Sequence, residues 1–319
     1  MNWLGANVDG PLVIIRAIHF AATAMTGGSL IFRTVVAAPA LRSTPAATTV
    51  VRSQTRLTAW SGLAVAAASG VIWLQLQAVS MSGLSFGEAM TWDVLSTVLN
   101  ETQFGLVSKI RLVLAISLAA CLAFDHLARP RWLALAAALG FIAAVAWTGH
   151  AGSTPGAMGK VHLTADTLHL LAAAAWIGGL VPLALLLAAA RRYHSLAWTS
   201  LARDVTRRFS TLGIVSVATL LVTGIVNAWI LVGSSGALPA TEYGRLLMLK
   251  IAVFAIMLAF AVVNRFWLTS QLAGSPQNEP QVKALDQLTR NSVIEIALGL
   301  TIFAIVGALG TLHPAIHSM

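Results

Sequence analysis

The chain has 319 residues, of which 57% are hydrophobic and only 10% are charged, and its mean hydropathy is +0.81. Soluble domains carry about 25% charged residues, so this composition excludes a soluble globular protein. The net charge of +9 would suit a nucleic-acid partner in a soluble protein. Here the basic residues stand between apolar runs, where they set membrane topology, and we expect no nucleic-acid partner. The single cysteine, Cys121, excludes a disulfide framework or a thiolate cluster within one chain.

The apolar runs are much longer than barrel strands and predict an all-α, polytopic membrane bundle of eight transmembrane helices. The start of the chain lacks the basic segment and small-residue cleavage site of a cleaved signal peptide, so the first span is expected to remain a helix. The eight spans are expected at residues 11–41, 54–80, 104–128, 131–151, 160–190, 205–233, 242–270 and 288–312.

Basic residues set the expected orientation. The connections after spans 1, 3, 5 and 7 are rich in arginine and lysine, whereas the opposite side has far fewer. The positive-inside rule therefore places these four connections in the cytoplasm and both termini outside. Six of the eight histidines then fall on the outer side, and only His126 and His194 on the cytoplasmic side. The long outer connection of about 81–103 contains Trp92 and predicts a short surface helix.

The two halves of the chain resemble each other. His19 precedes Gly28 in span 1 as His169 precedes Gly178 in span 5. Three further signatures recur in the same order: Ser69-Gly70 and Thr223-Gly224, Phe104-Gly105 before Lys109 and Tyr243-Gly244 before Lys250, and Leu139-Gly140 before His150 and Leu298-Gly299 before His313. The sequence thus predicts two parallel four-helix repeats, 1–151 with the outer loop and 152–319, related by an axis along the membrane normal.

Metal-capable side chains gather around span 5. His162, Asp166 and His169 lie at i, i+4 and i+7 and share one helix face. His150 ends span 4 just before a short Gly/Pro/Ser loop, so it can approach the same point. Imidazole binds copper, zinc, iron and nickel. We expect a metal site on the outer face from His150, His162, Asp166 and His169, with His19 and His313 near it.

Other roles for these residues remain open at this stage. Asp166 could orient a neighbouring histidine, or form an ion pair with Lys160, Lys109, Lys250 or Arg16. Arg16 stands three residues before His19, as Asp166 stands before His169, which suggests an intramembrane pair between them. Histidines on separate spans could also ligate haem. No Walker motif, defensible Ser-His-Asp order or paired thiols occur, so we do not expect an enzyme.

The chain resembles the copper-resistance D (CopD) family of inner-membrane proteins. The resemblance rests on the segment from His169 to Leu180, on Thr223-Gly224-Ile225-Val226-Asn227-Ala228, on Tyr243-Gly244-Arg245 through Lys250, on Asn264-Arg265, and on Arg290, Glu295 and Leu298-Gly299. It is best over about 160–312 and looser in the first half. It implies a bacterial inner-membrane protein of eight spans that handles periplasmic copper together with a small CopC-type periplasmic protein.

These observations favour a copper transport protein that accepts copper from the periplasm at the outer His/Asp site and moves it toward the cytoplasm. Two alternatives stay open: a haem-binding membrane redox protein, and a non-transporting copper-binding partner of a periplasmic copper protein. Histidine and carboxylate suit cupric copper, while methionines such as Met81 and Met90 would suit cuprous copper. The oxidation state of the copper therefore also stays open.

Overall fold

Eight long helices cross the molecule in a computed structural model that describes residues 2–3, 6–7, 9–125, 130–193, 195–272 and 279–317. Each is long and apolar enough to span a membrane, over Gly10–Ser43, Pro45–Ser82, Gln103–Ala123, Arg131–Thr148, Gly156–Tyr193, Leu196–Val232, Glu242–Gln271 and Gln281–Leu309. The predicted all-α polytopic bundle is therefore confirmed. His126 and His194, which the sequence assigned to the cytoplasmic side, lie outside the described residues.

The helices of the first half begin after a short antiparallel pair, β1 (Asn2–Trp3) and β2 (Ala6–Asn7). They are α1 (Gly10–Ile31), π-helix η1 (Phe32–Ala37), α2 (Ala38–Ala40), 3-10 turns η2 (Leu41–Ser43) and η3 (Pro45–Ala47), α3 (Thr48–Ser82), α4 (Phe86–Ala89), α5 (Trp92–Glu101), α6 (Gln103–Ala123), α7 (Pro130–Ala143), 3-10 helix η4 (Ala144–Thr148) and α8 (His150–Ser153).

The second half is built in the same way from long helices and short turns. It contains α9 (Gly156–Ala173), π-helix η5 (Ala174–Gly178), α10 (Gly179–Tyr193), α11 (Leu196–Val232), α12 (Ala237–Ala240), α13 (Glu242–Val263), π-helix η6 (Asn264–Leu268), α14 (Thr269–Gln271), α15 (Glu279–Leu309) and 3-10 turn η7 (Ala315–His317).

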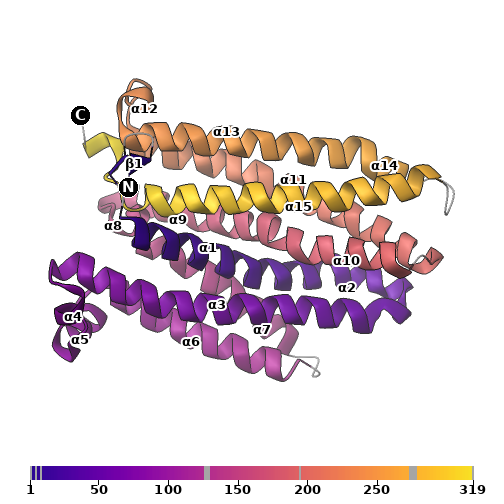
Figure 1. Ribbon diagram of the computed structural model, residues 1–319, viewed down its shortest axis with the longest axis horizontal. Helices are drawn as coiled ribbons and strands as arrows, with labels where there is room; N and C mark the ends of the chain where they lie inside the picture. The colour runs from indigo at the N-terminus through magenta and orange to yellow at the C-terminus, as the bar shows by residue number, and fades with distance from the viewer. Residues whose placement is uncertain are drawn as a thin grey trace.

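The two ends of the bundle differ (Figure 1). β1, the C-terminal end of α15 and the short helices α4, α5, α8 and α12 lie at one end, and α2 and α14 lie at the other. We call these the outer and the inner end, after the predicted orientation. The predicted surface helix in the outer loop is confirmed as α5, whose Trp92 is 76% exposed.

Three helices begin earlier at the inner end than the hydropathy suggested. α3 begins at Thr48, α11 at Leu196 and α15 at Glu279, against expected starts at 54, 205 and 288. Hydropathy ends a span at the first arginines, but an α-helix satisfies its own backbone and can continue past the apolar layer. These extensions carry three of the basic residues at the inner end, Arg52, Arg203 and Lys283.

The two halves meet where α1 crosses η5. A Cβ added to Gly28 would lie 2.6 Å from the Gly178 Cα, and one added to Gly178 would lie 2.6 Å from the Ala24 carbonyl carbon. Such distances leave no room for a side chain, so the glycines permit the helices to touch through their backbones.

Replacing Gly178 by alanine is expected to destabilise the protein by about 1–3 kcal/mol, because the new methyl group must separate the two backbones. Alanine is intrinsically better than glycine in a helix, so the loss would come from the crossing alone. Gly213→Ala is the matched control, since its Cβ would meet nothing within 4 Å. Thermal unfolding in detergent measures both, and equal stabilities would contradict the close contact.

A buried ion cluster joins three segments at the inner end. Arg33 of η1 and Arg52 of α3 both bind the carboxylate of Asp125, which follows α6, and the Arg52 guanidinium also donates to the Asp125 carbonyl. The Asp125 side chain is only 7% exposed. Burial alone would raise the pKa of this carboxyl group, but the hydrogen bonds and charges of the two arginines outweigh it and hold the pKa below its ordinary value.

Asp125→Asn is expected to lower stability by about 3 kcal/mol at neutral pH, because it leaves buried arginine charge unpaired. Since the pKa of Asp125 is lower in the folded state, its stabilisation is complete above about pH 3.8 and is lost as the pH falls through the folded value. The gap between wild type and variant should therefore close only in strong acid.

Asp286→Asn provides the comparison for this measurement. Asp286 pairs with Arg191 at 2.5 Å, but both side chains are about half exposed, so its loss should cost below about 1 kcal/mol. Unfolding in detergent at neutral and acidic pH separates the two variants, and similar losses would show that the Asp125 cluster is not a buried anchor.

Candidate functional site

A cavity of about 410 Å³ lies between helices of both halves, toward the outer end. Its wall includes four of the residues predicted from sequence: His150, His162, Asp166 and His169. α8 and α9 supply these four side chains, while α1, η4, η5, α11, α13 and α15 contribute to the rest of the wall. Most of that wall is apolar, so the ionisable groups are concentrated on one part of it. We call this space the outer cavity.

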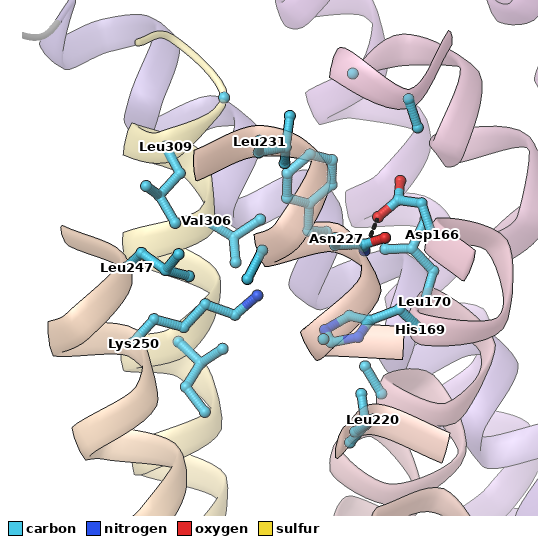
Figure 2. A pocket seen from close by; sticks show the side chains of 18 of the residues that line it. Asp166, His169, Leu170, Leu220, Asn227, Leu231, Leu247, Lys250, Val306 and Leu309 are labelled. Atoms are coloured by element: carbon cyan, nitrogen blue, oxygen red, sulfur yellow. Dashed lines mark hydrogen bonds between the residues drawn. The ribbon is translucent and has the colours of Figure 1, made fainter. Parts of the chain in front are cut away.

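Asp166 faces two polar neighbours across the outer cavity (Figure 2). Asn227 of α11 donates from Nδ2 to Asp166 Oδ1 at 3.2 Å, a hydrogen bond that joins α11 to α9. The Oδ1 atom of Asn227 is buried without a hydrogen-bond partner. Lys250 of α13 extends into the same space, where its charge attracts the carboxylate without forming an ion pair with it.

The suggested pair between Arg16 and Asp166 does not form. Arg16 lines the same cavity, but its guanidinium lies over the rings of Phe20 and Trp73, at 5.6 and 5.0 Å from their centres. The Arg16 Nε is buried and has no hydrogen-bond partner. Aromatic faces attract a cation, and α1 presents Phe20 one turn beyond Arg16. Equivalent positions in a repeat face equivalent neighbours, and need not face each other.

Each cavity histidine is oriented by a contact from another segment or turn. His169 Nδ1 lies 2.9 Å from Thr223 Oγ1 of α11, and His162 Nδ1 lies 2.8 Å from Thr154 Oγ1. His150 Nε2 approaches the carbonyl of Leu309 at 3.4 Å. A hydrogen bond to one ring nitrogen fixes the ring and directs the other nitrogen, which is how proteins prepare imidazole for a metal.

Two further predicted residues lie elsewhere. His19 is 3% exposed and has both ring nitrogens engaged, Nδ1 with Ser69 Oγ at 3.0 Å and Nε2 with Arg111 at 2.7 Å. His313 is exposed at the outer end and does not line the outer cavity. Among the residues that the structure describes, no three His, Cys, Asp or Glu side chains converge closely enough to hold a metal ion.

One contact is similar in the two halves: His19 Nδ1 lies beside Ser69 Oγ, and His169 Nδ1 lies beside Thr223 Oγ1. His19, Ser69 and Arg111 in the first half correspond to His169, Thr223 and Lys250 in the second. Sequence alignment paired Lys250 with Lys109, but both Arg111 and Lys250 stand six residues after the glycine that follows an N-cap threonine. Counting residues from the N-cap threonines, Thr102 and Thr241, would have identified Arg111 as the counterpart of Lys250.

Arg111 holds the first-half arrangement together. It donates to the Phe141 carbonyl at 2.5 Å and to Thr23 Oγ1 at 3.0 Å, in addition to its contact with His19. Arg111→Lys keeps the charge but loses the planar fork, so we expect about 1–3 kcal/mol of destabilisation. Lys109→Arg, two residues away on an exposed face, should have little effect. If chemical unfolding gives equal values for both variants, the arrangement does not contribute to stability.

A second cavity of about 330 Å³ lies toward the inner end and was missed by sequence reasoning. Its polar wall includes Glu295 of α15, Asn264 and Arg265 of η6, and Thr206 and Ser210 of α11. Trp176 of η5 and Leu221 of α11 line both cavities. Glu295 is the single carboxylate in the apolar run of span 8. A buried polar site on this span could have been inferred from that residue.

Eight apolar spans that enclose cavities lined in part by ionisable side chains define a polytopic α-helical membrane protein. Two family descriptions match the chain: "Copper resistance protein D-like, N-terminal domain" over residues 7–160 and "Copper resistance protein D" over residues 203–309. The chain belongs to the copper resistance protein D family.

Three characterised relatives agree with this assignment. Copper resistance protein D of Pseudomonas syringae pv. tomato is 29% identical over 78% of this chain and 80% of its own length. Inner membrane protein YebZ of Escherichia coli (strain K12) is 27% identical over 95% and 98%. Copper transport protein CutJ of Bacillus subtilis (strain 168) is 33% identical over 39% of this chain and 22% of its own length.

Proposed function

We propose that the chain moves copper from the periplasm toward the cytoplasm across a bacterial inner membrane, without catalysing a reaction. Copper enters the outer cavity and is bound there by His150, His162, Asp166 and His169. The observation that carries the proposal is that one cavity gathers these four residues in a protein of a copper-resistance family. Imidazole and carboxylate are suitable copper ligands.

Binding in this cavity requires the side chains to close on the metal. The four residues are near one another without forming a three-ligand cluster, and Lys250 provides positive charge beside Asp166 before copper binds. An arriving copper ion replaces that charge and draws His169 and Asp166 together. The unpartnered Asn227 oxygen is a further donor that faces this position.

The first half serves as the scaffold in this proposal. His19 would become a ligand only if Arg111 moved away from its Nε2 atom, so we place it outside the binding step. His313, exposed at the outer end, is available to receive copper first. The donor that fits this end is a small periplasmic copper-binding protein of the CopC type.

The proposal predicts which variants lose copper. His162→Ala and His169→Ala in the purified protein should each weaken copper binding by at least about tenfold, since each removes a ligand. Thr223→Val should also weaken it by about tenfold, because it frees the ring of His169. Ser69→Ala is the matched control: it removes the corresponding contact from His19, which does not bind copper, and should leave the affinity unchanged. Competition titration against a copper chelator measures all four.

Transport is tested with the same variants in proteoliposomes. Copper uptake should depend on the wild-type protein and fall in parallel with affinity in His169→Ala. The purified protein should carry copper and show no Soret band, since haem is not part of the proposal. Wild-type affinity in both histidine variants would refute the site. Copper binding without uptake would favour a non-transporting membrane protein that binds copper as the partner of a periplasmic protein. A Soret band would favour the haem-binding redox protein.

A further inference from the structure

The inner cavity contains a buried carboxylate that the outer site does not use. Glu295, in the middle of α15, is 2% exposed. Its Oε1 atom accepts a hydrogen bond of 2.6 Å from Asn264 Nδ2. Asn291 in turn donates from Nδ2 to Asn264 Oδ1 at 2.7 Å. This chain of amides orients Asn264 so that its NH₂ group points at Glu295.

Glu295 has no cation partner among the described residues. Among the described residues, the ion pairs involve the carboxylates of Asp125, Asp204 and Asp286. Arg265 is the other charged residue in the wall of the inner cavity, and its guanidinium donates to Ser210 Oγ at 2.7 Å. The lining residues from α10, α11, α13 and α15 add no further titratable group. A carboxylate buried in a membrane without a cation is neutralised by a proton.

The other side-chain atoms in the wall of the inner cavity that can bind a metal ion are oxygens. Thr206 Oγ1 is buried and has no hydrogen-bond partner, and the residue lines the same space as Ser210 and Glu295. No histidine, cysteine or methionine lines the described wall of this cavity. Oxygen donors hold copper more weakly than imidazole or sulfur do. A weak site is what an ion needs in order to leave after it has been bound.

The two cavities adjoin each other, as a path for an ion from the outer to the inner end requires. Trp176 and Leu221 line both, and Trp176 is 2% exposed, so its indole ring is part of the partition between them. It belongs to η5, a π-helical segment, and Asn264 begins another, η6. π-helical segments are frequent at functional sites because they leave the regular backbone ladder locally open.

We propose that the inner cavity is a transient cation site in which Glu295 carries a proton when the site is empty and releases it when a copper ion arrives. The inference rests on the proposed copper transport and adds its inner step. The exchange is balanced: the carboxylic acid loses its proton to water, and the carboxylate that remains binds the cation. Copper and protons therefore compete for Glu295, and an acidic inner compartment hinders the entry of copper into the inner cavity by keeping Glu295 protonated.

The experiment measures copper uptake into proteoliposomes of defined orientation at acidic and alkaline internal pH. Wild-type uptake should be faster at alkaline internal pH. Glu295→Gln has the same shape but cannot ionise, so its uptake should be at least about tenfold lower and independent of internal pH. Glu101→Gln, on an exposed position at the outer end, is the matched control and should behave as wild type.

Infrared spectroscopy supplies a readout that does not depend on transport. The copper-free protein should show a carboxylic-acid C=O band that is absent from Glu295→Gln and that disappears when copper is added to wild type. Uptake that is the same in Glu295→Gln as in wild type, or the absence of that band from copper-free wild type, would overturn the inference. Neither result affects copper binding at the outer cavity, whereas loss of all uptake by wild type would instead count against transport itself.

Discussion

The contact between Gly28 of α1 and Gly178 of η5 determines how the two halves of this protein meet. Because neither residue has a side chain, the two backbones touch at the centre of the bundle. The crossing fixes Trp176, two residues earlier, between the outer and the inner cavity. It also fixes the height at which α1 presents Arg16 to the outer cavity. This helix contact therefore lies next to the side chains that separate the two cavities.

Similar histidine contacts stand beside different cations in the two halves. In the first half, the Arg111 guanidinium hydrogen-bonds both His19 and the Phe141 carbonyl. His19 therefore has no free ring nitrogen, and the arrangement contributes to structure. In the second half, Lys250 takes the corresponding place and makes no such fork. His169 and Asp166 are therefore left facing a cavity. A membrane protein can keep ionisable groups inside its bundle when they face a cavity or a partner, and the two halves illustrate both solutions.

Much of this arrangement could be predicted from the sequence. Hydropathy located all eight spans. Helical spacing selected His162, Asp166 and His169, and the short loop before span 5 added His150; all four line one cavity. The remainder depended on how helices rotate and pack. Spacing cannot show that His19 has both nitrogens engaged, that Arg16 turns toward Trp73, or that Glu295 opens into a second cavity. Each of these depends on a neighbour from a distant part of the chain.

The account rests on copper binding in the second half rather than in the first. The most direct measurement is a structure of the copper-loaded protein with anomalous scattering recorded at the copper edge. We expect a peak in the outer cavity, within bonding distance of His162 or His169 and close to Asp166. A fully loaded protein whose only copper peak lies beside His19 and Arg111, or outside both cavities, would contradict the account.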